Sequence, residues 1–73
     1  MKQSIVYQLG NQVRALRKES GITQEKLAGR SSISLKYIQR IEGKNPPDIG
    51  LEMLEKLAKG FEIPLWKLLK FTN

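Results

Sequence analysis

The chain has 73 residues, a formal net charge of +6, and neither cysteine nor histidine. A domain of this size hides only roughly 60% of the surface that its unfolded chain exposes, so its core is thin and partner subunits often add stability. The missing residue types exclude disulfides and an ordinary zinc site. We therefore expect one domain over residues 1–73, with no cofactor and no metal, supported by association with a second copy.

Composition also bears on the class of function. An enzyme is disfavoured, because without histidine and cysteine the activation of a nucleophile and general-base chemistry lose their usual residues, and no two carboxylates share a plausible cleft. No run of roughly 18 apolar residues suggests a membrane span, and MKQSIVYQLG lacks a signal-peptide core. The basic amphipathic run PLWKLLKF is too short to favour a membrane surface. We expect a soluble, cytoplasmic protein.

The positive charge lies in the first part of the chain. Residues 1–44 hold nine basic and three acidic side chains, whereas residues 45–73 hold four of each. A positive field favours a polyanion such as nucleic acid near residues 1–44. Charge by itself leaves an ordinary basic surface as the alternative.

Hydrophobic spacing predicts helices along the whole chain. The first, over about residues 4–18, has one apolar stripe formed by Ile5, Leu9, Val13 and Leu16. Gly21 suits the left-handed position that ends a helix. Thr23 is a good N-cap for a short second helix, from Gln24 to about Arg30, that turns Leu27 and Ala28 inward.

A tight turn over residues 31–33 leads to a third helix, which Ser34 caps and Gly43 stops. Its buried pair is Ile38 and Ile41, with Tyr37 beside them. Residues 45–48 form a loop, since two prolines cannot continue a helix. A fourth helix over residues 51–59 turns Leu51, Leu54, Leu57 and Ala58 to one face, and Gly60 closes it. Pro64 then starts a last helix over about residues 65–71.

Two short helices joined by a tight turn, the second capped and basic, have the form of a helix-turn-helix motif, here over residues 23–44. The run GITQEKLAGRSSISLKYIQRIEGKNPPDIGLEMLEKLAKGFEIPLWKLL resembles the Cro and phage-repressor-type (XRE) helix-turn-helix family. The residues in register with its usual pattern are Gln24, Leu27, Ala28, Ile33, Ser34, Ile38, Ile41, Glu42, Leu54, Leu57 and Ala58. The resemblance implies an all-α, compact five-helix, lambda-repressor-like DNA-binding domain. The chain also resembles small single-domain regulators such as restriction–modification controllers.

The sequence departs from this pattern at both ends of the motif. Ser32 occupies the turn position usually filled by glycine, so it adopts a left-handed conformation, at roughly 1 kcal/mol, or shifts the turn. The Gly43–Lys44 pair follows Glu42 one residue early, which leaves the path from residue 43 to 45 open. No recognition residue is lost.

The resemblance implies that residues 34–42 form a recognition helix in the major groove. Leu35, Lys36 and Arg40 are expected at base edges, with Arg40 suited to guanine and Leu35 to a thymine methyl group or to packing. The family glutamine at position 24 binds a phosphate, and Lys44 and Asn45 follow where the DNA backbone passes. The whole expected DNA-binding set is Thr23, Gln24, Ser34, Leu35, Lys36, Tyr37, Gln39, Arg40, Lys44 and Asn45. For Arg14, Lys26 and Arg30 we favour a solvated face.

Two further expectations concern contacts within and between chains. In the resembling repressors, residues at the positions of Arg17 and Glu42 form an ion pair, and we expect one that orients the recognition helix. The last helix carries more apolar residues than one core can hide. Leu65, Leu68 and Leu69 are expected to face inward and Trp66 outward. A homodimer contact is therefore predicted from Trp66, Leu65, Leu69 and Phe71.

The function that follows is a sequence-specific transcriptional regulator that binds a palindromic operator in double-stranded DNA as a homodimer. Its recognition helices would lie one DNA turn apart, about 34–36 Å. The competing interpretation is an antitoxin or another protein-binding module on the same fold, because a fold does not decide function.

Overall fold

Five helices account for most of residues 4–71, which are the residues that the computed structural model describes. They are α1 (Ile5–Ser20), α2 (Gln24–Ser31), α3 (Leu35–Ile41), α4 (Leu51–Phe61) and α5 (Leu65–Leu68). No strand occurs over this range. The all-α, five-helix architecture predicted from hydrophobic spacing is confirmed. None of the described helices is long and apolar enough to cross a bilayer.

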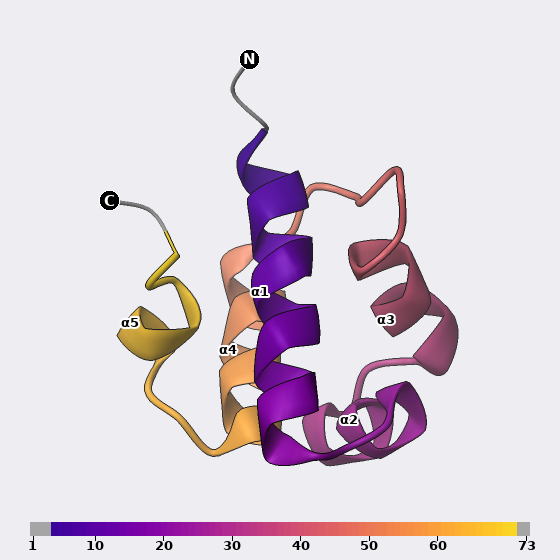
Figure 1. Cartoon of the computed structure of the whole chain (residues 1–73), viewed down its shortest axis with the longest axis vertical. Helices are drawn as coiled ribbons and strands as arrows, with labels where there is room; N and C mark the ends of the chain where they lie inside the picture. Colours follow the sequence, from indigo (N-terminus) through magenta and orange to yellow (C-terminus); the bar gives the residue numbers. More distant parts are fainter. Residues whose placement is uncertain (1–3, 72–73) are drawn as a thin grey trace.

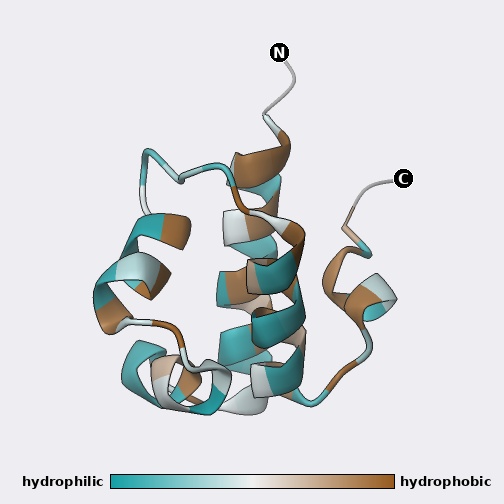
Figure 2. Cartoon of the chain, turned by 180° about the vertical axis from the view of Figure 1, so that it is seen from behind, coloured by the Kyte–Doolittle hydropathy of each residue, from teal (hydrophilic) through white to brown (hydrophobic). Residues whose placement is uncertain are grey.

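The two longest helices form the centre of the molecule. α1 and α4 lie against each other, with α2 and α3 on one side and α5 on the other (Figure 1). α2 packs mainly on α4, while α3 packs on α1 and α2. Hydrophobic and hydrophilic segments alternate along the helices when the ribbon is coloured by hydropathy (Figure 2), and the hydrophobic core is buried between the helices. α3 is therefore attached to the rest of the domain from two sides.

Capping residues set the ends of the short helices. The hydroxyl of Thr23 accepts from the backbone N–H of Lys26 at 3.0 Å, and that of Ser34 accepts from the N–H of Tyr37 at 3.2 Å. Both N-caps are confirmed. Ser32 takes the left-handed conformation, with φ of 58°, so the first of the two expected outcomes for this turn holds and no glycine is needed.

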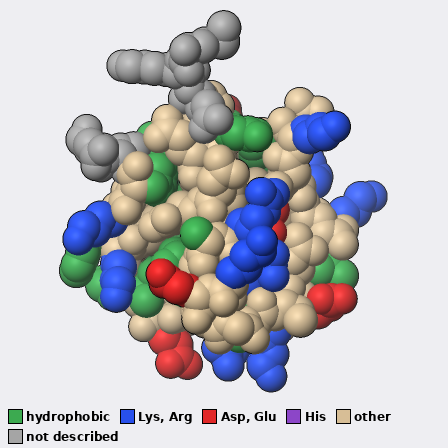
Figure 3. Space-filling view, viewed as in Figure 1, with side chains coloured by type: hydrophobic (Ala, Val, Ile, Leu, Met, Phe, Trp, Pro, Cys, Tyr) green, Lys and Arg blue, Asp and Glu red, His purple; other side chains and the backbone are tan. Residues whose placement is uncertain are grey.

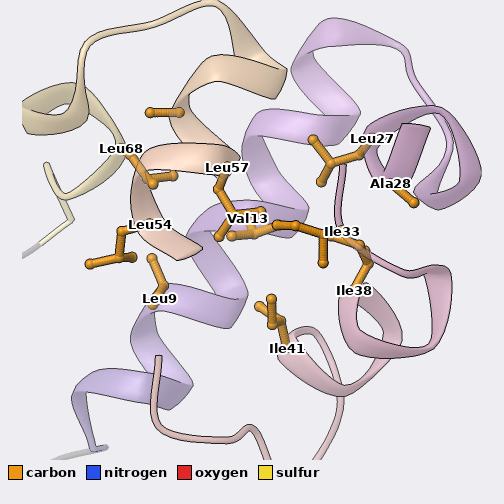
Figure 4. Close-up of a cluster of buried hydrophobic side chains, with 11 residues drawn as sticks. Leu9, Val13, Leu27, Ala28, Ile33, Ile38, Ile41, Leu54, Leu57 and Leu68 are labelled. Atoms are coloured by element: carbon orange, nitrogen blue, oxygen red, sulfur yellow. The ribbon is translucent and has the colours of Figure 1, made fainter. Parts of the chain in front are cut away.

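The core draws on every helix. Val13 lies at its centre, fully buried between α3 and α4 (Figure 4). The other buried hydrophobic residues are Leu9, Leu27, Ala28, Ile33, Ile38, Ile41, Leu54, Leu57, Ala58 and Leu68. Every one of the expected inward residues of α2 and α3 belongs to this cluster.

Three residues expected to face inward do not. Ile5 is 64% exposed, Leu51 76% and Leu69 36%. Ile5 and Leu51 are the first residues of their helices, where the apolar stripe continues but no other element within residues 4–71 covers it. Leu69 follows α5 directly, because that helix ends at Leu68 and not near residue 71.

Gly60 does not close the fourth helix. It is a buried residue within α4, and a Cβ built on it would lie 2.9 Å from the Cβ of Ser31. The glycine therefore lets α4 and α2 cross closely. The helix ends after Phe61, where Glu62 takes the left-handed conformation at φ of 59°.

Candidate nucleic-acid interface

The outer face of α3 carries polar and basic side chains. Ile38 and Ile41 are fully buried, which leaves Lys36, Gln39 and Arg40 exposed. Lys36 and Arg40 are four residues apart and so share one side of the helix. Two cations and an amide thus lie together where the helix meets solvent.

Leu35 and Tyr37 occupy the borders of that face. Leu35 is half-buried and packs against the core, so much of its apolar surface is already covered. The hydroxyl of Tyr37 lies 3.5 Å from the carbonyl oxygen of Asp48. Both residues therefore attach α3 to the rest of the chain.

The N-terminus of α2 lies close to the C-terminus of α3. The side-chain amide of Gln24 donates to Oε1 of Glu42 at 3.1 Å. Thr23 uses its hydroxyl to cap α2. The first backbone N–H groups of a helix have no partner inside it and favour an anion. The side chain of Gln24 thus holds the end of α3, and its backbone N–H is one of the helix-start groups that favour an anion.

Glu42 is a buried carboxylate, with only 5% of the residue exposed. Arg17 donates to it through Nε and Nη2, each at 2.9 Å. The pKa of Arg17 is raised, chiefly by this hydrogen bond, against the opposing effect of burial. Arg17 also donates to the carbonyl of Ile22 at 3.2 Å. The expected ion pair is therefore present, and it joins α1 to the end of α3.

Arg14 has a structural contact that the sequence interpretation did not include. Its guanidinium donates through Nη2 to the backbone carbonyl of Glu42, and its Nε lies 3.8 Å from the carboxylate. The side chain is 44% exposed. Spacing offered a signal, since Arg14 is one turn before Arg17 on the same side of α1.

The chain leaves α3 through Gly43, and Lys44 and Asn45 then lie exposed. An open recess lies between α1, the start of α2 and the C-terminal end of α3. It is lined by Arg14, Arg17, Lys18, Thr23, Gln24, Glu25, Gln39 and Glu42. In the space-filling view, a column of Lys and Arg side chains crosses the middle of the face over α1 (Figure 3).

A separate apolar surface lies around α5. Trp66 is 65% exposed, as expected, while Leu65 and Phe71 are half-buried against the core. Beside them is a hollow of about 240 Å³, lined by Ile5, Val6, Leu9, Ile49, Leu54, Leu69 and Phe71. Single exposed hydrophobic residues are common, whereas a contiguous group of them often marks an interaction site.

α2, the turn over residues 32–34 and α3 are the parts of a helix-turn-helix. A model of the helix-turn-helix domain family matches residues 10–73 of the chain. The protein belongs to this family. No curated protein sequence matches it.

Solved structures extend the comparison. The restriction–modification controller C.Esp1396I, bound to a 25 base pair operator site, is 28% identical with a TM-score of 0.81, over 93% of this chain and 92% of that one. The controller C.AhdI from Aeromonas hydrophila is also 28% identical, with a TM-score of 0.79, over 86% and 94%. The clp gene regulator ClgR from C. glutamicum shares the fold, with a TM-score of 0.83 at 22% identity over 93% and 87%.

Proposed function

We propose that this chain is a sequence-specific transcriptional regulator that binds double-stranded DNA as a homodimer, with α3 in the major groove of a palindromic operator. The observation that carries the proposal is the exposed face of α3, where Lys36, Gln39 and Arg40 lie together on a helix fixed at both ends. The similarity to a controller solved on its operator supports it.

Base reading rests on the two cations of α3. Arg40 presents a planar fork that matches O6 and N7 of guanine, and such a pair contributes about 1–3 kcal/mol of discrimination. Lys36, on the same side of the helix, reaches guanine or a neighbouring phosphate. Gln39 lies at the recess and suits adenine. Leu35 and Tyr37 offer only their uncovered edges, for example to a thymine methyl group.

Phosphate contacts flank the base-reading face. The backbone N–H groups at the start of α2, next to Thr23 and Gln24, form one anion site. Ser34, exposed at the start of α3, is proposed as a further phosphate contact. Lys44 and Asn45 form a second site at the other end of α3. Contacts of this kind fix the register of a protein on DNA and carry no base information.

The dimer contact is proposed at the apolar surface around α5. Trp66 is its exposed aromatic residue, Leu65 is half-buried next to it in the chain, and Leu69 and Phe71 line the hollow beside α1. Aromatic residues are enriched in such contacts. A two-fold pair would set the two α3 helices about 34–36 Å apart, which a palindromic operator matches.

Selection of binding sites from random duplexes, repeated at several salt concentrations, tests the proposal. We expect a palindromic consensus bound at least about a thousandfold more tightly than unrelated duplexes. Affinity should fall steeply with salt as counterions are released. Equal binding to all duplexes would contradict a sequence-specific regulator. An apolar surface that captured a toxin while DNA selection failed would favour the antitoxin alternative.

The biological setting we propose is the control of restriction–modification genes inside the cell, in the cytoplasm, with no catalytic step. The similarity to two controller proteins supports this setting. The genes next to its own provide the check. A reporter fused to the promoter beside a neighbouring methyltransferase or endonuclease gene should respond to the chain, and a promoter without the selected site should not.

A further inference from the structure

The C-terminal end of α3 touches α1 backbone to backbone. Gly10 is buried, and a Cβ built on it would overlap the carbonyl oxygen of Ile41 and lie 3.7 Å from Cα of Glu42. Glycine inside a helix is destabilising relative to alanine, since it adds backbone entropy to the unfolded chain. The close approach explains the glycine here, because no side chain fits between the helices.

One turn along α1, Arg14 donates to the carbonyl of Glu42. The last carbonyls of a helix have no partner inside it, and a cation near them is favourable. This carbonyl belongs to the peptide plane that joins Glu42 to Gly43. The N–H of the same plane, that of Gly43, donates to the carbonyl of Arg40 at 3.1 Å. Arg14 holds the oxygen at the opposite edge of the plane, so the two contacts together restrain the torsions on either side of it, including one of the glycine.

The carboxylate of Glu42 has different partners, namely Arg17 and Gln24. Arg17 and Gln24 hold the end of the Glu42 side chain, and rotation about the bonds of that side chain still allows the backbone to move. Arg14 is the side chain that holds the backbone at this point, and it therefore adds a restraint on the direction in which the chain leaves α3. The residues immediately after the restrained plane are Lys44 and Asn45, both exposed.

We infer that Arg14 is a positioning residue for DNA binding, which directs Lys44 toward its backbone phosphate while α3 reads the bases. Gly10 allows α1 to approach closely enough for this contact. The inference rests on the proposed function, since it assigns Arg14 a role in the same interface. Arg14 itself acts through the peptide plane and not through contact with DNA.

A double-mutant cycle between Arg14 and Lys44 tests the inference in the full chain. Arg14→Met keeps side-chain length and removes the donor. Alone, it should weaken operator binding about five- to tenfold more than Arg30→Met, which removes the same charge from an exposed position on α2. In a Lys44→Ala background, this additional loss should disappear. Arg14→Lys, which retains a charged donor, should recover part of the affinity.

Amide hydrogen exchange of the free protein gives a readout that a general loss of stability would not produce. In Arg14→Met, exchange should accelerate at Gly43 and Lys44 and stay unchanged in the middle of α4. Additive losses in the cycle, or equal effects of Arg14→Met and Arg30→Met, would overturn the inference. A wild-type chain that binds selected and scrambled duplexes equally would instead overturn the proposed function itself.

Discussion

Glu42 shows at the scale of one residue how a buried charge is tolerated. Its carboxylate accepts hydrogen bonds from three N–H donors on two side chains, and a second arginine donates to its backbone carbonyl. Desolvating a carboxylate is costly, and good partners offset that cost. The ion pair of Arg17 and Glu42 thus contributes less to net stability than to the placement of α3. Removing one of the two residues should destabilise the protein more than replacing both with apolar residues.

Arg17→Ala should therefore destabilise the domain by about 3 kcal/mol, because a buried carboxylate is left with fewer partners. Thermal unfolding should move down by more than about 10 °C. As a control, combining Arg17→Met with Glu42→Met should cost less than the two single changes added together. Unchanged stability and DNA affinity in Arg17→Ala would contradict an orienting role for the pair.

Left-handed residues offer a second prediction at this scale. Gly21, Ser32 and Glu62 all follow helix ends with positive φ, and two of them are not glycine. Ser32→Gly and Glu62→Gly should each stabilise the chain by about 0.5–1 kcal/mol, because relief of strain exceeds the added entropy of the unfolded chain. Urea unfolding measures the change. Gly21→Ala, the opposite exchange, should destabilise the chain. If Ser32→Gly and Glu62→Gly both lowered the free energy of unfolding, the proposed backbone strain at these two residues would be refuted.

At the scale of elements, one side of α3 packs against the core and the opposite side presents the residues proposed to contact DNA. Ile38 and Ile41 face the core, and the cations face outward. The capped N-terminus and the ion pair at its end hold this short helix, which would not be stable alone. The proposed interface therefore depends on α1 and α2 as much as on the residues that would touch DNA.

Base-reading and phosphate-binding roles have different signatures. Arg40→Ala should relax one position of the selected consensus, at a cost of about 1–3 kcal/mol. Lys44→Ala should weaken all duplexes alike and reduce the salt slope by about one per monomer. Both are measured by competition binding at several salt concentrations. If Arg40→Ala weakened every sequence equally, its proposed role in base reading would fail.

The contact between α1 and α3 can be tested with two glycines inside helices. Gly29→Ala should stabilise by about 0.5–1 kcal/mol, since a Cβ there meets nothing within 4 Å. Gly10→Ala should destabilise by more than about 1 kcal/mol, because the new methyl group displaces the Ile41 carbonyl. Chemical denaturation measures the free energy of unfolding of both variants. If both became more stable, α1 and α3 would be able to move apart at Gly10 without loss of stability.

At the scale of the whole molecule, basic and apolar surfaces occupy different parts. The excess of basic over acidic side chains belongs to α1, α2 and α3, because residues 45–73 carry as many acidic as basic residues. The exposed tryptophan belongs to α5, and the hollow lies between the start of α1 and the residues after α5. This separation suits a dimer that leaves two reading helices free. A small core also makes the chain dependent on its partner, so folding and association should be linked.

Trp66→Ala should shift sedimentation toward the monomer and weaken operator binding, because two linked half-sites become two separate binding events. The thermal midpoint of the wild type should rise with protein concentration, and that of the variant should depend on it less. Lys70→Ala serves as the surface control. If Trp66→Ala sediments like wild type, the tryptophan is not the dimer contact.

Local sequence determined much of this protein. Spacing of apolar residues predicted five helices, and the cap residues Thr23 and Ser34 set the start of α2 and α3, because helix periodicity and capping depend on residues a few positions apart. The register of Gln24, Glu42 and the buried isoleucines identified the motif. Arg17 and Glu42 were predicted as a pair only through the family resemblance.

Tertiary structure decided the rest. Leu51 and Ile5 share the stripe of buried residues but lie exposed, since periodicity names a face of a helix and not the element that covers it. Gly60 lies inside α4, where the lack of a side chain leaves room for α2 to cross. Gly10 leaves room in the same way for the end of α3. Arg14 gained its partner 28 residues away only when α1 and the end of α3 met. Sequence specifies local conformation, while contacts between distant segments appear only once the helices pack.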